Sequence, residues 1–378
     1  MSPAPDPVPE QDAFINFRSV SKSYDGGSYV VYGLNLAIRK GEFLSLLGPS
    51  GSGKTTTLMM LAGFETPSKG EITLGGKRLD DQPPHKRDIG MVFQNYALFP
   101  NMSIAENIAF PLSVRGVSRA EQQQKVRKAL EMIELPHIAN RTPAQLSGGQ
   151  QQRIALARAL VFEPSLVLMD EPLGALDKRL RETMQQEIKR LHRELGITLV
   201  YVTHDQGEAL TMSDRVAVFY DGRIQQIGAP ADLYENPSNA FVANFVGENN
   251  SLRGLAHDTH TDHATLHLPG GARLLAGRCR ADLSEGSPAT LSVRPERVRL
   301  GEAILSDDNS LPGTVADIVY YGDHRRVLID LDGGGNMVAK LPNTQQQSLP
   351  APGSPIRVGW SASDCKILPP PPKPPIDD

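Results

Sequence analysis

The sequence is poor in cysteine and has no long hydrophobic run. Its 378 residues include two cysteines, Cys279 and Cys365, which lie far apart and outside any CxxC pattern. Neither a disulfide framework nor a structural zinc site is expected from them, and the chain suits a reducing cytosol. No stretch reaches the roughly 18 uninterrupted apolar residues that span a bilayer. Membrane contact is therefore expected only through partner proteins.

An excess of charge of one sign is also missing. The chain has 39 basic and 43 acidic residues, a formal net charge of -4. A nucleic-acid-binding protein presents a basic patch or stripe, and this balance gives no such footprint. We therefore expect no nucleic-acid partner.

The length predicts two domains. Residues 1–12 lack a basic region and an apolar core, so they predict a disordered tail and not a signal peptide. In residues 13–242, short apolar strands alternate with helices, which predicts a parallel α/β sheet. In residues 243–368, short alternating runs broken by Gly, Pro and Asp predict a small all-β barrel. Residues 369–378 form a Pro-rich tail.

Local patterns add detail to the first domain. The segment "GEITLGGKRL" predicts a hairpin around Gly75 and Gly76. A helical block is expected over residues 103–134, and further helices over 150–161 and 178–195. These elements predict antiparallel and helical subdomains beside the parallel sheet.

The segment "GPSGSGKT" fits the pattern G-x-x-x-x-G-K-[ST]. It follows the apolar strand "FLSLL" and precedes a helix, a context that favours a phosphate cradle over a Gly-rich turn with a chance lysine. The glycines let backbone N–H groups converge on phosphate oxygens, the lysine places a cation there, and the threonine hydroxyl can hold Mg²⁺. The ATP-binding residues are predicted to be the eight residues of this segment and the residue that follows it: Gly48, Pro49, Ser50, Gly51, Ser52, Gly53, Lys54, Thr55 and Thr56.

Acidic and polar residues follow three further apolar strands. Asp170 and Glu171 end the run "LVLMDE", where ligands bind in open α/β sheets. Asp170 is expected to hold Mg²⁺ and Glu171 to polarise the attacking water as a general base. His204 and Gln94 end neighbouring strands and are expected to orient that water, with Gln94 also a metal ligand. Without the phosphate cradle, Asp170 and Glu171 would be interpreted as helix-capping residues.

In this order the motifs resemble those of the ATP-binding subunits of ABC transporters. The signature "LSGGQ" spans residues 146–150, and a D-loop "GALD" spans residues 174–177, beginning with Gly174 where the family usually has Ser. The resemblance implies that Tyr24 stacks on adenine and that Asp177 contacts a partner copy across a head-to-tail homodimer. It also implies that the signature residues of one copy close on the ATP held by the other. These residues are Ser147, Gly148, Gly149 and Gln150.

The same resemblance implies ATP and Mg²⁺ as cofactors and a peripheral position on the cytoplasmic face of the inner membrane. The implied partners are two transmembrane permease subunits and a substrate-binding protein. The apolar segment after Gln94 either receives a permease helix or packs the helical subdomain. The residues in question are Tyr96, Leu98, Phe99 and Met102.

The second domain resembles the TOBE-type, OB-like regulatory domain of importer ATPases, with the motif "RPE" at residues 294–296. The sequence of this domain is most similar to that of the spermidine/putrescine importer ATPases, and the sugar, ferric-ion and sulfate importers are the alternatives. A soluble ABC ATPase acting on nucleic acid or ribosomes, and a regulatory sensor that sequesters a partner, are weaker readings. A histidine run favours a solvated hairpin over a metal site. Its members are His257, His260, His263 and His267.

Overall fold

The computed structural model describes residues 12–260, 263–277, 283–304, 309–343 and 350–372. The chain divides into two compact units, Met1–Ala231 and Asp232–Asp378. The two predicted tails lie largely outside the described residues. The domain boundary predicted between residues 242 and 243 stays a prediction.

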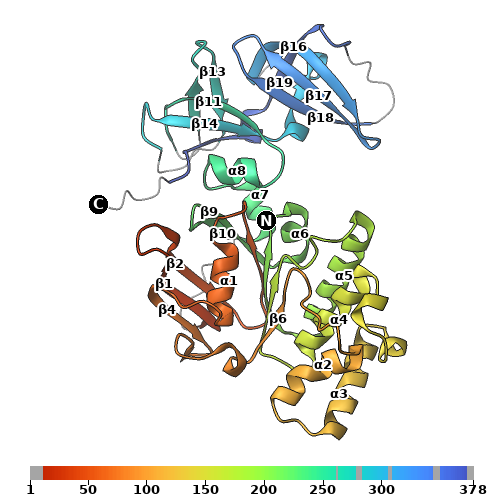
Figure 1. Ribbon diagram of the computed structural model, residues 1–378. Helices are drawn as coiled ribbons and strands as arrows, with labels where there is room; N and C mark the ends of the chain where they lie inside the picture. The colour runs from red at the N-terminus through yellow and green to blue at the C-terminus, as the bar shows by residue number, and fades with distance from the viewer. Residues whose placement is uncertain (1–11, 261–262, 278–282, 305–308, 344–349, 373–378) are drawn as a thin grey trace. The chain divides into compact units, whose positions relative to one another are not determined.

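A six-stranded sheet forms the centre of the first unit, in the order β10-β9-β3-β8-β7-β6 (Figure 1). The five strands from β9 to β6 are parallel, and β10 pairs antiparallel at the edge. Because β3, β7 and β8 are buried along their whole length, they read as continuous apolar runs. The strands are β3 (Phe43–Leu47), β6 (Ile89–Val92), β7 (Leu166–Asp170), β8 (Thr198–Thr203), β9 (Arg215–Tyr220) and β10 (Arg223–Gly228).

An antiparallel sheet, in the order β2-β1-β4-β5, packs against one side of this core. The turn between β4 and β5 contains Gly75 and Gly76, with φ of 54° and 76°. Two consecutive residues of positive φ are what a tight hairpin needs, so the predicted hairpin is confirmed. The strands are β1 (Ile15–Ser23), β2 (Tyr29–Ile38), β4 (Lys69–Leu74) and β5 (Lys77–Arg78).

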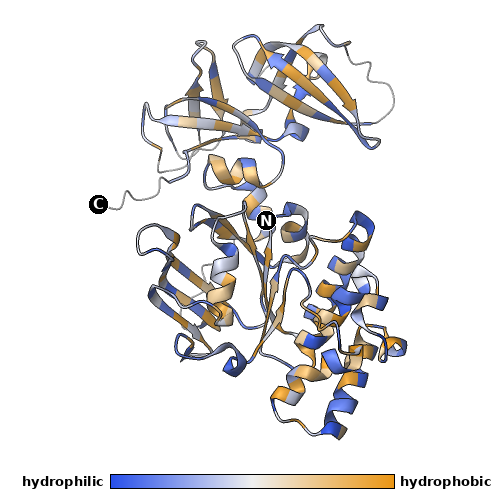
Figure 2. Cartoon of the chain, in the orientation of Figure 1, coloured by the Kyte–Doolittle hydropathy of each residue, from blue (hydrophilic) through white to orange (hydrophobic). Residues whose placement is uncertain are grey.

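Helices cover the central sheet and build a helical subdomain from α2, α3 and α4, which share a core around Ile108, Leu130 and Ile154. The helix α5 is mostly hydrophilic and buries only one stripe (Figure 2). Among the described residues, no helix combines the length and apolarity needed to cross a bilayer. The helices of this unit are α1 (Lys54–Ala62), α2 (Ile104–Val114), α3 (Arg119–Met132), α4 (Gly148–Leu160), α5 (Lys178–Leu195) and α6 (Gln206–Met212).

The described strands of the second unit pair antiparallel and form two five-stranded sheets around a shared core that contains the buried Trp360. The first sheet has the order β13-β12-β11-β14-β20, and the second β15-β19-β16-β17-β18. Together with the first unit, this confirms the predicted fold class. The elements are α7 (Pro230–Glu235), α8 (Ala240–Phe245), β11 (Asn250–His257), β12 (Ala264–His267), β13 (Arg273–Ala276), β14 (Pro288–Val293), β15 (Arg299–Leu300), β16 (Asn309–Tyr320), β17 (His324–Leu331), β18 (Asn336–Pro342), β19 (Pro355–Trp360) and β20 (Cys365–Leu368).

Arg294, the first residue of the "RPE" motif, anchors the segment before β11 to the β sheets. Its guanidinium donates hydrogen bonds to the carbonyl oxygens of Tyr234, Ala243 and Glu248. It also lies 4.0 Å from the centre of the Tyr234 ring. Because a buried arginine needs its donors satisfied, this motif has a structural reason to exist within the unit.

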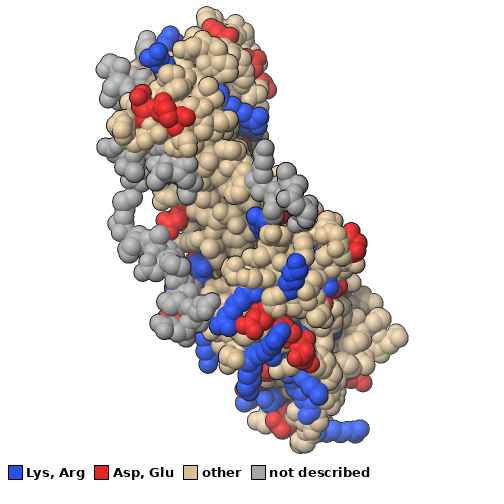
Figure 3. Space-filling view, turned by 90° about the vertical axis from the view of Figure 1, so that its left-hand side faces the viewer, with Lys and Arg blue, Asp and Glu red and all other residues tan. Residues whose placement is uncertain are grey.

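Basic and acidic side chains alternate on the face of the first unit that Figure 3 shows. Ion pairs on the antiparallel sheet include Arg18 with Glu71 at 2.8 Å and Arg78 with Asp80 at 2.6 Å. The described charges on this face therefore make no field of one sign.

Candidate functional site

The loop between β3 and α1 depends on glycine for its close approaches. A Cβ at Gly48 would lie 2.4 Å from the carbonyl oxygen of Phe219, and one at Gly53 would lie 2.7 Å from that of Val30. Gly53 also has a φ of 96°, which disfavours any other residue. The loop therefore leads tightly into α1, whose first N–H groups have no partner within the helix.

Lys54 begins α1 and is buried, with 4% of its surface exposed. Its Nζ donates hydrogen bonds to the carbonyl oxygens of Gly48 and Pro49, both at 2.8 Å. Burial lowers the pKa of Lys54, and the nearby Glu171 and Asp170 act against that shift. The ammonium group is thus held in the loop beside two carboxylates.

Asp170 ends β7 and accepts a hydrogen bond from Thr55 Oγ1 at 3.1 Å. Burial raises the pKa of its carboxyl group, while the Thr55 hydroxyl and Lys54 oppose this rise. The chain thereby places a hydroxyl and a poorly hydrated carboxylate side by side at the sheet edge.

Glu171 follows directly, on backbone with a φ of 42°. Such a conformation is costly for a non-glycine residue and is found where the surrounding structure enforces it. Its Oε2 lies 3.2 Å from His204 Nδ1 and 3.4 Å from Gln94 Nε2. Three predicted catalytic residues from three different strands therefore meet at one carboxylate oxygen.

One cavity of about 290 Å³ gathers most of the predicted nucleotide and metal residues. Its lining residues are Val30, Ser50, Gly51, Ser52, Gly53, Lys54, Thr55, Thr56, Gln94, Asp170 and Glu171. Val30 was not predicted. It reaches the loop through its backbone on β2, a contact that leaves no mark in the sequence.

Other predicted residues do not line this cavity. Tyr24 follows β1, is 60% exposed, and has Lys22 Nζ at 4.8 Å from its ring centre. Asp177 is exposed and caps α5 by accepting a hydrogen bond from the N–H of Leu180. Ser147 and Gly148 are exposed at the start of α4. Within one chain, these residues are not part of the cavity lining.

The signature residues have structural roles within the chain. Ser147 Oγ accepts from the N–H of Gln150, and Gln150 Oε1 accepts from the N–H of Ser147, which is a capping box. This cap explains why α4 begins at Gly148, two residues before the predicted start. A Cβ at Gly149 would lie 2.8 Å from Leu180 Cδ1, so this glycine leaves room for the Leu180 side chain.

An apolar groove of about 440 Å³ lies beside the segment that follows Gln94, and we call it the Phe groove. Phe99 lines it and is 36% exposed, whereas Tyr96 and Leu98 pack into the cores and Met102 lies outside the lining. The segment thus contributes both to a surface and to packing. The aromatic residues of the groove are Phe64, Phe93, Phe99, Phe110 and Phe162, with Arg115 and Arg158 beside them.

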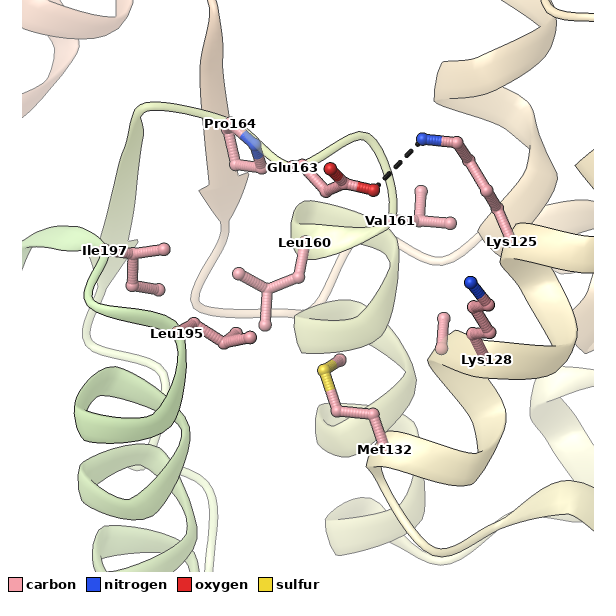
Figure 4. Close-up of a pocket in the computed structure, with 10 residues that line it drawn as sticks. Lys125, Lys128, Met132, Leu160, Val161, Glu163, Pro164, Leu195 and Ile197 are labelled. Carbon is pink, nitrogen blue, oxygen red and sulfur yellow. Dashed lines mark hydrogen bonds and ion pairs between the residues drawn. The ribbon is translucent and has the colours of Figure 1, made fainter.

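A larger cavity, of about 540 Å³, lies away from the phosphate cradle (Figure 4). Met132, Leu160 and Leu195 contribute its apolar surface, and Lys125 at its rim pairs with Glu163 at 3.1 Å. Its residues precede β7 and β8, whereas Asp170 and His204 lie at the opposite ends of these strands. Size alone would therefore have pointed to the wrong end of the sheet.

Two of the four histidines lie on strands, His257 on β11 and His267 on β12, and their rings stack at 4.1 Å. His257 Nδ1 lies 2.7 Å from Glu285 Oε1. Across the described parts of the chain, no group of three or more His, Cys, Asp or Glu side chains is arranged to hold a metal ion.

The model of the ABC transporter family matches residues 31–174, and that of the TOBE domain matches residues 291–368. The chain is 46% identical over 357 residues to Spermidine/putrescine import ATP-binding protein PotA of Rubrobacter xylanophilus, which covers 94% of this chain and 93% of the relative. It is 45% identical over 350 residues to Uncharacterized ABC transporter ATP-binding protein YdcT of Escherichia coli, covering 92% and 96%.

A solved structure is similar to the first unit. It is the dimeric structure of a post-hydrolysis state of the ATP-binding cassette MJ0796 bound to ADP and Pi. The TM-score is 0.51 at 36% identity, and the match covers 56% of this chain and 97% of that one.

Proposed function

The chain belongs to the ABC transporter family, as an ATP-binding and ATP-hydrolysing subunit of an importer, and we propose that two copies close on two ATP molecules to drive polyamine uptake. One observation carries the proposal. A single cavity gathers Lys54, Asp170 and Glu171, while the exposed Ser147 and Gly148 lie outside it. The cradle is thus half of a site, and a second copy supplies the other half.

Within the cradle, each residue has a role that its geometry supports. When ATP binds, phosphate oxygens take over the hydrogen bonds that Lys54 Nζ makes to the carbonyl oxygens of Gly48 and Pro49. The N–H groups at the start of α1 add donors and the positive end of the helix dipole. The exposed Tyr24 stacks on the adenine ring.

The donor set also fits Mg²⁺. The Thr55 hydroxyl and the Asp170 carboxylate lie 3.1 Å apart, and Mg²⁺ takes oxygen ligands from one or two carboxylates together with phosphates. A divalent cation would offset the burial of Asp170, and the amide oxygen of Gln94 is a further ligand within the same cavity. When bound, Mg²⁺ neutralises charge on the phosphate oxygens.

Hydrolysis depends on Glu171 as general base. Its carboxylate accepts a proton from the attacking water, and His204 and Gln94, which both lie beside Oε2, orient that carboxylate and the water. The left-handed backbone at Glu171 aims the side chain into the cavity.

The second copy completes the site through its signature. Ser147 and Gly148 at the start of α4 offer backbone donors and a helix N-terminus to the γ-phosphate of the facing subunit. Asp177 contacts the partner at the same seam. Support comes from the related cassette of known structure, which is dimeric and bound to ADP and Pi. Hydrolysis then releases the contact, and this converts chemistry into opening and closing.

Permeases are the membrane partners of importer ATPases, and we assign their docking site to the Phe groove. The groove exposes Phe64 and Phe110 to 55% and 37%, and aromatic grooves of this kind receive amphipathic helices. Two permease subunits and a substrate-binding protein complete the complex, with this chain on the cytoplasmic face. Polyamine cargo is supported by the printed names of the curated relatives.

Uptake measurements test the proposal. In a strain that lacks this chain, the wild-type protein should restore uptake of labelled spermidine and putrescine, and Glu171→Gln, which cannot act as a base, should not. Restoration of sugar, ferric-ion or sulfate uptake in place of polyamine uptake would contradict the assignment of polyamine as the cargo. Equal restoration by Glu171→Gln would overturn ATP-driven transport.

A further inference from the structure

The backbone directly after Gln94 is strained. Tyr96 and Ala97 are consecutive non-glycine residues with φ of 62° and 47°. The N–H of Tyr96 donates to the carbonyl oxygen of Phe93 at 2.9 Å, and that of Ala97 donates to Asn95 at 2.7 Å. A three-residue turn with positive φ at its centre is rare and unfavourable, so something must hold it.

Two contacts hold this turn. The Tyr96 side chain is 6% exposed and packs in the core that α4 shares with the central sheet. This packing anchors the central residue of the turn. From α4, Arg158 Nη2 donates to the carbonyl oxygen of Tyr96 at 2.7 Å, and Nη1 donates to that of Ala97 at 2.8 Å. Two donors on one rigid plane fit two consecutive carbonyls, a geometry that lysine cannot reproduce.

The surroundings of Arg158 make these bonds important. Partial burial lowers the pKa of its guanidinium. Its charge lies 5.8 Å from the centre of the Phe99 ring, and its side chain lines the Phe groove together with Ala97 and Phe99. A group that enters the groove therefore meets the arginine that holds the turn.

The turn also bears on catalysis. Gln94 lies two residues before Tyr96, and its Nε2 is 3.4 Å from Glu171 Oε2. If the turn relaxes, Gln94 moves relative to the general base. We propose that Arg158 is a positioning residue: it keeps the strained turn after Gln94 in place and thereby holds Gln94 beside Glu171. This inference rests on the proposed function and names a further residue that the same site depends on.

Glycine substitution separates this role from ordinary packing. Ala97→Gly removes the cost of positive φ at one of the two strained positions, so the turn depends less on Arg158. In the assembled complex, Arg158→Met should lower kcat for ATP by about tenfold with little change in KM, and adding Ala97→Gly should restore most of the loss. Arg158→Lys should behave as Arg158→Met does, and it replaces that variant if Arg158→Met does not fold.

Arg115 provides a matched control. It lines the same groove, with its guanidinium 3.7 Å from the centre of the Phe162 ring, and it donates to the carbonyl oxygen of Pro111 on its own helix, not to the turn. If Arg115→Met lowers kcat for ATP, adding Ala97→Gly should therefore not restore it.

The outcomes separate the inference from its premise. If the wild-type complex hydrolyses ATP and Ala97→Gly leaves the Arg158 defect unchanged, the positioning role is wrong and the proposed function stands. If Ala97→Gly restores kcat in Arg115→Met as well as it does in Arg158→Met, the rescue is not specific to Arg158 and its positioning role is also wrong. If the wild-type complex hydrolyses no ATP, both fall together.

Discussion

Among single residues, Glu208 on α6 is a buried carboxylate that contacts the end of β8, directly before His204. Its side chain is 3% exposed and accepts hydrogen bonds from the hydroxyls of Tyr201 at 2.8 Å and Thr203 at 2.7 Å. Burial raises the pKa of Glu208, and these hydroxyls act against the rise without cancelling it. The carboxylate thus braces the end of β8, directly before His204, at a cost in stability.

That cost depends on pH. Below the unfolded pKa, near 4.5, Glu208 is protonated in both states and does not oppose folding. As pH rises through the higher folded pKa, the unfolded state loses its proton more readily, so the free energy of unfolding falls. Glu208→Gln removes this titration. Urea unfolding from about pH 4 to pH 8 should show the variant gaining stability relative to the wild type as pH rises. A constant or opposite difference would contradict the buried-carboxylate explanation.

Among the elements, α4 joins the parts of the site. It begins at the signature cap of Ser147, carries Arg158 to the turn after Gln94, and ends against β6. At that end, a Cβ on Gly90 would lie 2.4 Å from the carbonyl oxygen of Ala159. Only glycine allows the strand and the helix to approach this closely.

Substitution of Gly90 tests this packing. Gly90→Ala pushes the α4 backbone away, so it should lower the free energy of unfolding by about 1–3 kcal/mol in urea titrations. Gly174→Ala is the matched control, since its Cβ would meet only the carbonyl oxygen of Glu171 at 3.6 Å, an ordinary contact. Equal losses in both variants would refute the close-approach argument.

The sequence predicted elements whose signals are local. The hairpin at Gly75 and Gly76 and the helix α5 follow from turn chemistry and periodicity, and the cradle follows from the spacing around Lys54. Contacts made through backbone carbonyls were not predictable. Arg158 reaches carbonyls 61 and 62 residues away, and any residue type offers the same oxygen atoms. The close packing of Gly149 on Leu180 was hidden because the motif already offered another reason for glycine.

For the whole molecule, we propose that one chain holds two halves of different sites. The cradle around Lys54 lies in one cavity, and Ser147 is exposed on another helix. In a head-to-tail dimer, each active site takes its cradle from one copy and its signature from the other. A defect in either half should therefore be complementable by a copy that carries the other defect.

Mixing two inactive variants measures this directly. Lys54→Ala removes the cation of the phosphate cradle, and Ser147→Arg puts a bulky side chain at the signature. Neither variant should therefore hydrolyse ATP on its own. In an equimolar mixture, half of the dimers are mixed and each has one intact site, so phosphate release should recover to roughly a quarter of the wild-type rate. Recovery of this order is the result that the account predicts. A mixture no more active than its separate components would contradict the shared site.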